Sequence, residues 1–257
     1  MSPLWPDTVH VGLFPGLCWL KSKRAEKVLS IASPPVHDAK ALLDTLAVML
    51  DTEANMLRKG SKVVVTVSNS VAAIASLPWQ PSLTLESELQ GYARVCFEKF
   101  GVAIDDEWTI HTEFRHYGAM GLAYALPNAW LASLIDLLQA RGLRLQTVLP
   151  VTAKAYAHRM LRRQAGKSLI LLQETLCNSA LVVDGNGLCS YDAEPVIGSS
   201  QESSVRLLKR VGAREGKIGS VISWALDLEE KEGTPDFIED CLPGATCQVV
   251  SHNAWSR

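Results

Sequence analysis

The sequence has 257 residues, a formal net charge of −2 and 47% hydrophobic residues, a composition ordinary for a globular protein with a sizeable core. A charge so close to zero argues against a general electrostatic attraction to nucleic acid or to an anionic membrane. No basic segment followed by an apolar core opens the chain and no apolar run is long enough to span a bilayer, so we expect a cytoplasmic protein without a secretory signal.

The first predicted feature along the chain is a β-hairpin. Residues 9–14 and 17–21 form its two strands, and Pro15-Gly16 supplies the bend. Residues 27–33 extend this sheet by a third strand. The N-terminal part of the chain is therefore expected to be a small antiparallel unit.

Helices and strands then alternate. Asp38 is a good N-cap for a helix that runs to Lys59, and residues 61–68 are a compact β-branched run typical of a buried central strand. Apolar residues at helical spacing predict further helices over residues 85–100, 128–142, 150–163, 200–211 and 235–242. Further strands are predicted over residues 71–77, 108–114, 119–126, 143–149, 217–224 and 248–251.

A second hairpin lies in the stretch SLILLQETLCNSALVVDGNG. Its strands are residues 169–172 and 180–183, and the Asp-Gly-Asn-Gly run at residues 184–187 then favours the positive φ angles of a tight return. Because strands and helices alternate and a hairpin opens each half, the predicted fold class is α/β with mixed sheets.

The six cysteines contain no C-x-x-C pair, which weakens a zinc interpretation. Cys177 and Cys189 flank one hairpin, so a disulfide between them has to be considered. If Asp184 pairs with Gly187, Cys189 lies opposite Val182 and not opposite Cys177, so the bridge is misplaced. We therefore expect free thiols, most of them buried.

The order of elements resembles the actin-like cytoplasmic proteins of type IV pilus assembly, the PilM family, and the related cytoplasmic half of the type II secretion GspL proteins. The resemblance is clearest over residues 77–157, in the segments LPWQPSLTLESELQGYARVCFEKFGV and AYALPNAWLASLIDLLQARGLRLQTVLPVTAKAYA. With the two hairpins it covers most of the chain. Each motif alone is degenerate, and the collinear order carries the resemblance.

The resemblance implies an actin-like (RNase H-like) two-lobed fold with mixed sheets and a small inserted αβ subdomain. Residues 1–157 would form the first lobe, with the inserted subdomain at about residues 71–126. Residues 158–257 would form a second, shortened lobe.

The family's phosphate-holding positions are altered in this sequence. The first hairpin of the family reads G-I/L-D-x-G with a downstream lysine, and the second reads D-x-G-x-x-x-T. By resemblance, the degenerate nucleotide-binding positions here are Gly12, Phe14, Gly16, Lys21, Gln173, Thr175 and Gly198. Phe14 stands where the first acid belongs, Gln173 where the second belongs, and Thr175 at a glycine position. The family's adenosine-side glycine pair is replaced by the run Val-Ile-Ser-Trp at residues 221–224.

These replacements predict that the chain does not hydrolyse ATP. Mg²⁺ requires carboxylate and phosphate oxygens, and glycine lets backbone N–H groups approach a phosphate. Phe14 cannot ligate a metal, and Thr175 crowds the phosphate loop. Glu174 is a carboxylate one residue along, but in an extended strand it should point to the opposite face. We expect no bound metal or cofactor, although weak, non-hydrolytic ATP binding stays open.

Other candidate sites receive structural interpretations. Cys96 with His111 and His116 could form a thiol nucleophile and base, but Cys96 falls on the apolar stripe of its helix, and the histidines suit a surface strand. A second group of residues comprises candidates for partner docking, namely Trp79 and the basic residues Arg159, Arg162 and Arg163. The alternatives are core packing for the tryptophan and a favourable interaction with the helix dipole for the basic residues.

The predicted function is that of a non-catalytic cytoplasmic scaffold in a type IV pilus or type II secretion-like inner-membrane assembly. By resemblance it would bind the cytoplasmic N-terminal tail of a bitopic, PilN-like membrane protein, and would contact the assembly or retraction ATPase. It would lie at the inner membrane through that partner and bind no nucleic acid. The alternative is an active actin-like ATPase or a relative of the sugar kinases.

Overall fold

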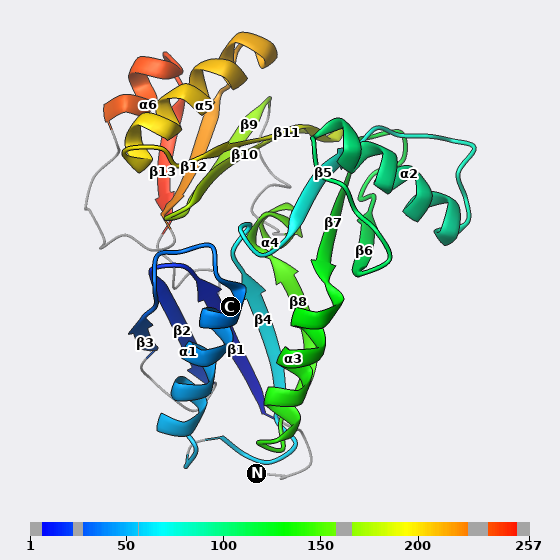
Figure 1. The fold of residues 1–257 in the computed structure, drawn as a ribbon. Coiled ribbons are helices and arrows are strands. Elements are labelled where there is room, and N and C mark those ends of the chain that lie inside the picture. Colours follow the sequence, from blue (N-terminus) through cyan, green and yellow to red (C-terminus); the bar gives the residue numbers. More distant parts are fainter. Residues whose placement is uncertain (1–6, 23–27, 56, 158–165, 226–235, 251–257) are drawn as a thin grey trace, which may run out of the picture.

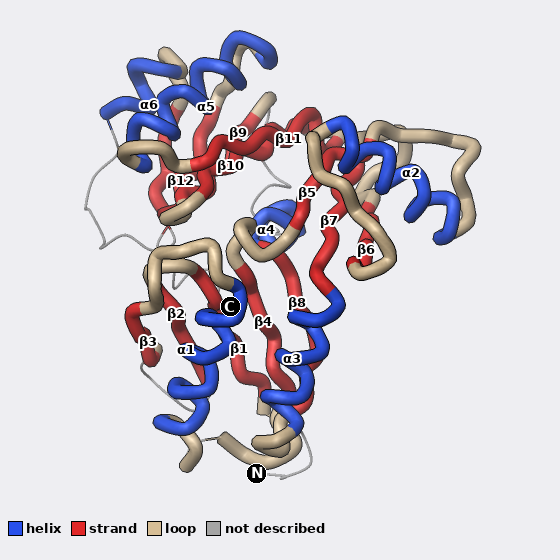
Figure 2. The backbone as a smooth tube through the Cα atoms, in the orientation of Figure 1, coloured by secondary structure: helices blue, strands red, loops and turns tan. Residues whose placement is uncertain are grey.

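The computed structural model describes residues 7–22, 28–55, 57–157, 166–225 and 236–250, which form three β-sheets with helices against them (Figures 1 and 2). The first sheet consists of β1 (Thr8–Phe14), β2 (Leu17–Ser22), β3 (Leu29–Ala32), β4 (Lys62–Val67) and β8 (Arg144–Pro150). The strands lie in the order β3-β2-β1-β4-β8. The β1–β2–β3 meander is antiparallel, whereas β1, β4 and β8 run parallel to one another.

The second sheet repeats this plan. It consists of β9 (Ser168–Gln173), β10 (Cys177–Asp184), β11 (Gly187–Pro195), β12 (Ser220–Ala225) and β13 (Thr246–Val250), in the order β11-β10-β9-β12-β13. A smaller sheet consists of β5 (Ala73–Leu77), β6 (Trp108–Glu113) and β7 (Gly121–Pro127), in the order β5-β7-β6. The first and second sheets draw their strands from the segments predicted as two lobes, and the small sheet from the predicted insertion.

The helices cover the sheets in separate groups (Figure 1). α1 (Ala39–Thr52) and α3 (Asn128–Gln139) lie side by side on one face of the first sheet. α2 (Glu86–Lys99) packs on the small sheet, while α5 (Ser200–Glu215) and α6 (Asp236–Cys241) cover the second sheet. The short helix α4 (Val151–Ala157) lies between the two large sheets and contacts strands of both. It is therefore the structural joint of the molecule.

The core of the first sheet follows from alternating apolar residues. Every second residue of β1 and β4 is fully buried, in the sets Val9, Val11, Leu13 and Val63, Val65, Val67. These side chains share one hydrophobic cluster with the buried stripe of α1. The cluster continues into β9, β10 and β12, so the two large sheets share a common core.

The predicted local signals are mostly confirmed, with three differences. Asp38 caps α1, accepting hydrogen bonds from the backbone N–H groups of Lys40 and Ala41. The helix ends at Thr52 and not at Lys59; its last buried residue is Leu50, and Glu53 is its C-cap residue. All six cysteines are free, as expected, but only Cys18 and Cys96 are buried, and the other four are partly exposed. In the β10–β11 hairpin, however, a bulge leaves Val182 opposite Ser190, so Cys189 does not face Val182 as the simple register predicted.

The small sheet is attached to both neighbours through its β6–β7 turn. Met120 in this turn forms an isolated antiparallel bridge with Leu188 of β11. Arg115 donates to the carbonyl of Ala157, at the end of α4, over 3.2 Å, and its guanidinium lies 5.2 Å from the ring centroid of Tyr156. The inserted unit is therefore fastened to the joint helix and to the second sheet.

Candidate functional site

The bends of the two hairpins face each other across the boundary between the large sheets. The first bend lies between β1 and β2, where Gly16 has a φ of 93°. The second lies between β9 and β10, and its Thr175 donates its hydroxyl hydrogen to the carbonyl of Pro15 over 2.8 Å. We call this contact region the seam. The residues predicted as the degenerate pocket on the two bends are thus brought together.

Two large rings are buried in the core between the large sheets. Phe14, at the end of β1, is 1% exposed, and Trp224, near the end of β12, is also 1% exposed. Both belong to the hydrophobic cluster that joins the two large sheets. The Phe14 backbone carbonyl accepts a hydrogen bond from the hydroxyl of Ser33 at 2.6 Å, which fixes the hairpin end. Neither ring has a group that can ligate a metal ion.

Gly12 has a structural partner of its own. Its cross-strand neighbour is Trp19, and a Cβ on Gly12 would lie 2.1 Å from the Trp19 indole Nε1. The indole therefore occupies the space that the absent side chain leaves. Lys21 pairs with His10, four residue pairs away from the Phe14–Leu17 pair at the bend, so about 13 Å of strand separates Lys21 from the bend. Lys21 is thus not positioned at the seam.

The acid that reaches the first lobe is Glu174, and this corrects our expectation that Glu174 points away from the site. Gln173, the last residue of β9, turns into its own lobe, where its amide donates to Ser204 at 3.0 Å and accepts from Ser223 at 3.2 Å. Glu174 is 1% exposed and accepts from the backbone N–H of Asn69, with its two oxygens 3.1 and 3.3 Å away. Gln173 and Glu174 thus point to opposite sides, as strand alternation requires, and Glu174 is the one that faces the first lobe.

Asn69 forms the second half of this contact. Its side-chain amide donates to the hydroxyl of Ser179 at 3.0 Å, and its carbonyl oxygen accepts from the backbone N–H of Thr152 at 3.3 Å. Asn69 therefore joins β4, β10 and the first turn of α4, and caps an N–H that the helix itself leaves free. Sequence reasoning missed this residue. The only available signal was the polar triplet Ser-Asn-Ser that follows a buried strand.

No protein-family model matches the sequence, and no curated protein is detectably similar to it. Solved structures do match. The structure of a PilM–PilN type IV pilus biogenesis complex aligns over 96% of this chain and 89% of that chain, with 14% identity and a TM-score of 0.65. A Bacteroides thetaiotaomicron protein with an actin-like ATPase fold aligns over 94% and 90%, with 9% identity and a TM-score of 0.62.

The cytoplasmic domain of EpsL, an inner-membrane component of the Vibrio cholerae type II secretion system, aligns over 87% of this chain and 84% of that domain. The identity is 16% and the TM-score 0.50. The chain has the actin-like ATPase fold. The fold predicted from the resemblance to PilM and GspL is thereby confirmed.

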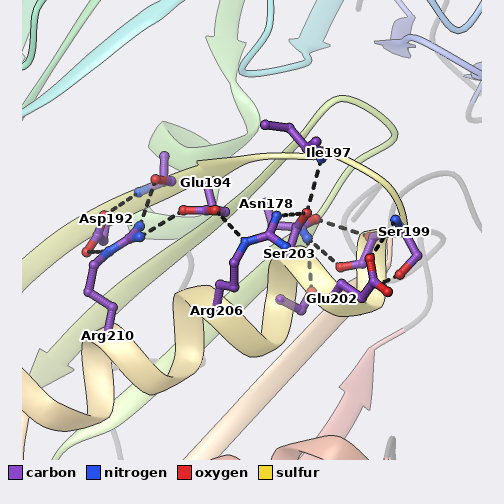
Figure 3. Close-up of polar contacts among 12 residues, drawn as sticks. Asn178, Asp192, Glu194, Ile197, Ser199, Glu202, Ser203, Arg206 and Arg210 are labelled. Carbon is purple, nitrogen blue, oxygen red and sulfur yellow. Dashed lines mark hydrogen bonds and ion pairs between the residues drawn. The ribbon is translucent and has the colours of Figure 1, made fainter.

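Within this actin-like fold, the helix that follows β11 begins with its own polar caps (Figure 3). Gly198 has a φ of 82° and leads into Ser199, whose hydroxyl accepts from the Glu202 N–H at 3.1 Å. The Glu202 carboxylate in turn accepts from the Ser199 N–H at 3.4 Å. This capping box uses N–H groups with which a helix N-terminus would otherwise bind an anion. Gly198 thus serves the start of α5.

The same helix carries a ladder of ion pairs along the edge strand β11 (Figure 3). Arg210 donates to Asp192 at 2.9 Å and to Glu194 at 2.8 Å, and Arg206 donates to Glu194 at 2.9 Å. Hydrogen bonds from Arg206 and then Arg210 lower the pKa of the Glu194 carboxyl. Arg214 extends the ladder to Asp192. These charges cover an edge that could otherwise pair with another strand.

The predicted docking residues are placed only in part. Trp79 is partly exposed, meets Phe114 edge to face with ring centroids 5.3 Å apart, and lies 5.0 Å from the ring of Tyr117, which is 89% exposed. This aromatic group lies on the small sheet. The remaining docking candidates, Arg159, Arg162 and Arg163, lie outside the described residues.

The alternative chemistries gain no support from the described part of the chain. Cys96 is 3% exposed in the core of the small sheet, while His111 is exposed and stacks on Tyr124 at 5.0 Å. Within the described ranges, no cluster of three or more His, Cys, Asp or Glu side chains is arranged to hold a metal ion. None of the helices described is both long and apolar enough to cross a membrane.

Proposed function

We propose that the chain is a non-catalytic cytoplasmic scaffold of a type IV pilus or type II secretion-like inner-membrane assembly. The observation that carries the proposal is the nearly full-length structural similarity to the PilM–PilN complex, which covers 96% of this chain with a TM-score of 0.65. The similarity to the cytoplasmic domain of EpsL points to the same class of machinery. In this proposal the protein lies at the inner membrane through a bitopic, PilN-like partner, contacts the assembly ATPase and binds no nucleic acid.

The proposed loss of catalysis is supported by the chemistry of the seam. Phosphoryl transfer depends on Mg²⁺ held by carboxylates and on backbone groups that surround the phosphates. Here Phe14 and Trp224 are buried apolar rings, Thr175 is bonded to Pro15, and the nearby carboxylate of Glu174 is engaged by a backbone N–H group. In this proposal, positions that hold a nucleotide in active relatives instead form a structural contact between the two lobes.

The catalytic part of the proposal is tested by Mg-ATP turnover. We expect no phosphate release above that of the buffer, and no difference between the wild type and Glu174→Gln. Turnover that Glu174→Gln abolishes would favour the alternative, an active actin-like ATPase. The substitution keeps the size of the side chain and one oxygen acceptor for Asn69, so it separates chemistry from folding.

The partner's tail is proposed to bind as an added strand at the outer edge of β8. This strand is the terminal one of the first sheet and has partly exposed residues along most of its length. A strand edge offers unpaired backbone groups to an extended peptide. The edge lies on the side of the first sheet toward the small sheet (Figure 1).

The test uses a synthetic peptide with the sequence of the cytoplasmic N-terminal tail of a PilN-like single-span protein from the same organism. We expect the synthetic tail to raise the melting temperature, and to slow amide hydrogen exchange in β8 but not in the edge strands β3 and β13. A scrambled tail is the control. Equal protection of all three edges, or of none at saturating tail, would contradict the proposed binding mode.

A further inference from the structure

Two segments of the first lobe meet at the end of the first sheet where β4 and β8 begin, which is the end away from the second sheet in Figure 1. The N–H of Gly60 donates to the carbonyl of Gly142 over 2.7 Å. The side chain of Lys59 lies beside the same glycine, since a Cβ on Gly142 would lie 3.2 Å from the lysine Cγ. Residues 57–62 and 141–146 therefore form one surface, which we call the basic end.

Positive charge is concentrated at the basic end. Its two segments contain no carboxylate and five cationic side chains, namely Arg58, Lys59, Lys62, Arg141 and Arg144. Asp7 pairs with Arg58 at 4.0 Å, and Asp51 pairs with Arg141 at 2.8 Å. The other three cations are exposed, and none of them forms an ion pair with a described residue. The basic end therefore presents three uncompensated positive charges to solvent.

Two of these three cations are direct neighbours in the sheet. Lys62 and Arg144 are partners in the parallel register of β4 and β8, so their side chains leave the sheet on the same face. Like charges directly opposite each other destabilise a sheet. Sequences that break a local rule of this kind tend to do so at functional sites. A bound anion would remove the repulsion, so the pair favours an anionic partner.

We propose that the basic end contacts the phosphates of anionic lipids at a membrane surface. Its free cations are long, exposed side chains, which suit a broad charged surface. Neither segment contains an aromatic residue on which a nucleic-acid base could stack. The choice of a membrane over an acidic protein rests on the proposed function, which places the chain beside the inner membrane.

The strength of this contact follows from the number of free cations. Each lysine or arginine near an anionic membrane favours contact roughly fivefold, so three together favour it roughly 150-fold. The net charge of −2 opposes this attraction only weakly, because charges more than about 10 Å from the membrane are screened at 0.1 M salt. A contact of this strength orients a protein that a tethered partner already holds at the membrane.

The direct test is co-sedimentation of the whole chain with lipid vesicles. At low ionic strength and excess lipid, we expect binding to vesicles that contain phosphatidylglycerol and none to vesicles of phosphatidylcholine alone. Salt at about 1 M should release the chain, because the Debye length is then about 3 Å. Absence of sedimentation with the anionic vesicles would overturn the proposal, as would equal sedimentation with both kinds of vesicle.

Two double variants with the same change of net charge assign the binding to the basic end. Lys62→Gln with Arg144→Gln should weaken vesicle binding roughly 30-fold. Lys209→Gln with Lys217→Gln, at two exposed lysines of the second lobe, should bind as the wild type does. Neither double variant should have a lower melting temperature, because all four side chains are exposed. An equal loss of binding in both double variants would refute the assignment.

An acidic protein is distinguished from lipid in the wild type, where the folding of a variant plays no part. An oligoglutamate peptide is compared with phosphatidylglycerol vesicles at equal concentration of negative charge. Tighter binding to the peptide would overturn the membrane proposal in favour of an acidic partner. The vesicle assay contains no partner tail, so its failure would leave the tail test at β8 unaffected, and a failure of the tail test would not affect the vesicle result.

Discussion

Gly12→Ala tests whether the glycine of the first hairpin is held by packing. A Cβ at Gly12 would lie 2.1 Å from Nε1 and 2.2 Å from Cε2 of the Trp19 indole, so the ring has to move. Trp19 is only 3% exposed, so the moved ring displaces other core atoms. Overpacking of this kind costs about 1–3 kcal/mol, and replacing a strand glycine by alanine returns about 0.5–1 kcal/mol. We expect a net loss of about 1–2 kcal/mol in the free energy of unfolding.

The assay is urea unfolding followed by circular dichroism, with Trp19→Val as the second arm of a double-mutant cycle. In the Trp19→Val background the clash is gone, so Gly12→Ala should be neutral or stabilising by up to about 1 kcal/mol. The coupling energy between the two positions should then be about 2 kcal/mol. Equal destabilisation in both backgrounds would refute the packing explanation.

Three further outcomes follow from the contacts. Asn69→Ala should lower the free energy of unfolding by about 2 kcal/mol, because it leaves the buried N–H of Thr152 without its acceptor; chemical denaturation measures this, and a loss below about 0.5 kcal/mol would contradict it. Because the pKa of Glu194 is lowered in the folded state, its ion pairs stabilise the protein fully above the ordinary carboxyl pKa, and this stability is lost as the pH falls through the lowered pKa. Between pH 5 and pH 3 the melting temperature should therefore fall less in Glu194→Gln than in the wild type. An identical decline in both proteins would count against the ladder. Gly91 lies at an exposed position of α2 with no atom near an added Cβ, so Gly91→Ala should raise the free energy of unfolding by about 1 kcal/mol. A lower melting temperature of this variant in thermal unfolding would contradict the prediction.

The features that the sequence predicts well are those whose chemistry is local. The Asp38 cap and the return between Asp184 and Gly187 each depend on a few neighbouring residues, and the structure contains both. The Trp19–Gly12 contact was also within reach, since a bend at Pro15-Gly16 pairs these two positions directly. The missing step was to compare side-chain volumes across the predicted pair.

The seam was harder to predict because its partners are distant in the chain. Asn69 and Glu174 are 105 residues apart, and Pro15 and Thr175 are 160 apart. Strand alternation correctly places Gln173 and Glu174 on opposite sides, but the local sequence does not show which of the two sides faces the first lobe.

The attachment of the small sheet has a mechanical consequence. Arg115 bonds the small sheet to the end of α4, and Met120 pairs it with the second sheet, so a rotation of the small sheet would strain both contacts. A force applied to the small sheet would therefore reach the second sheet directly and the helix α4 independently. The small sheet and the second sheet would then move together as one rigid unit, without a hinge between them.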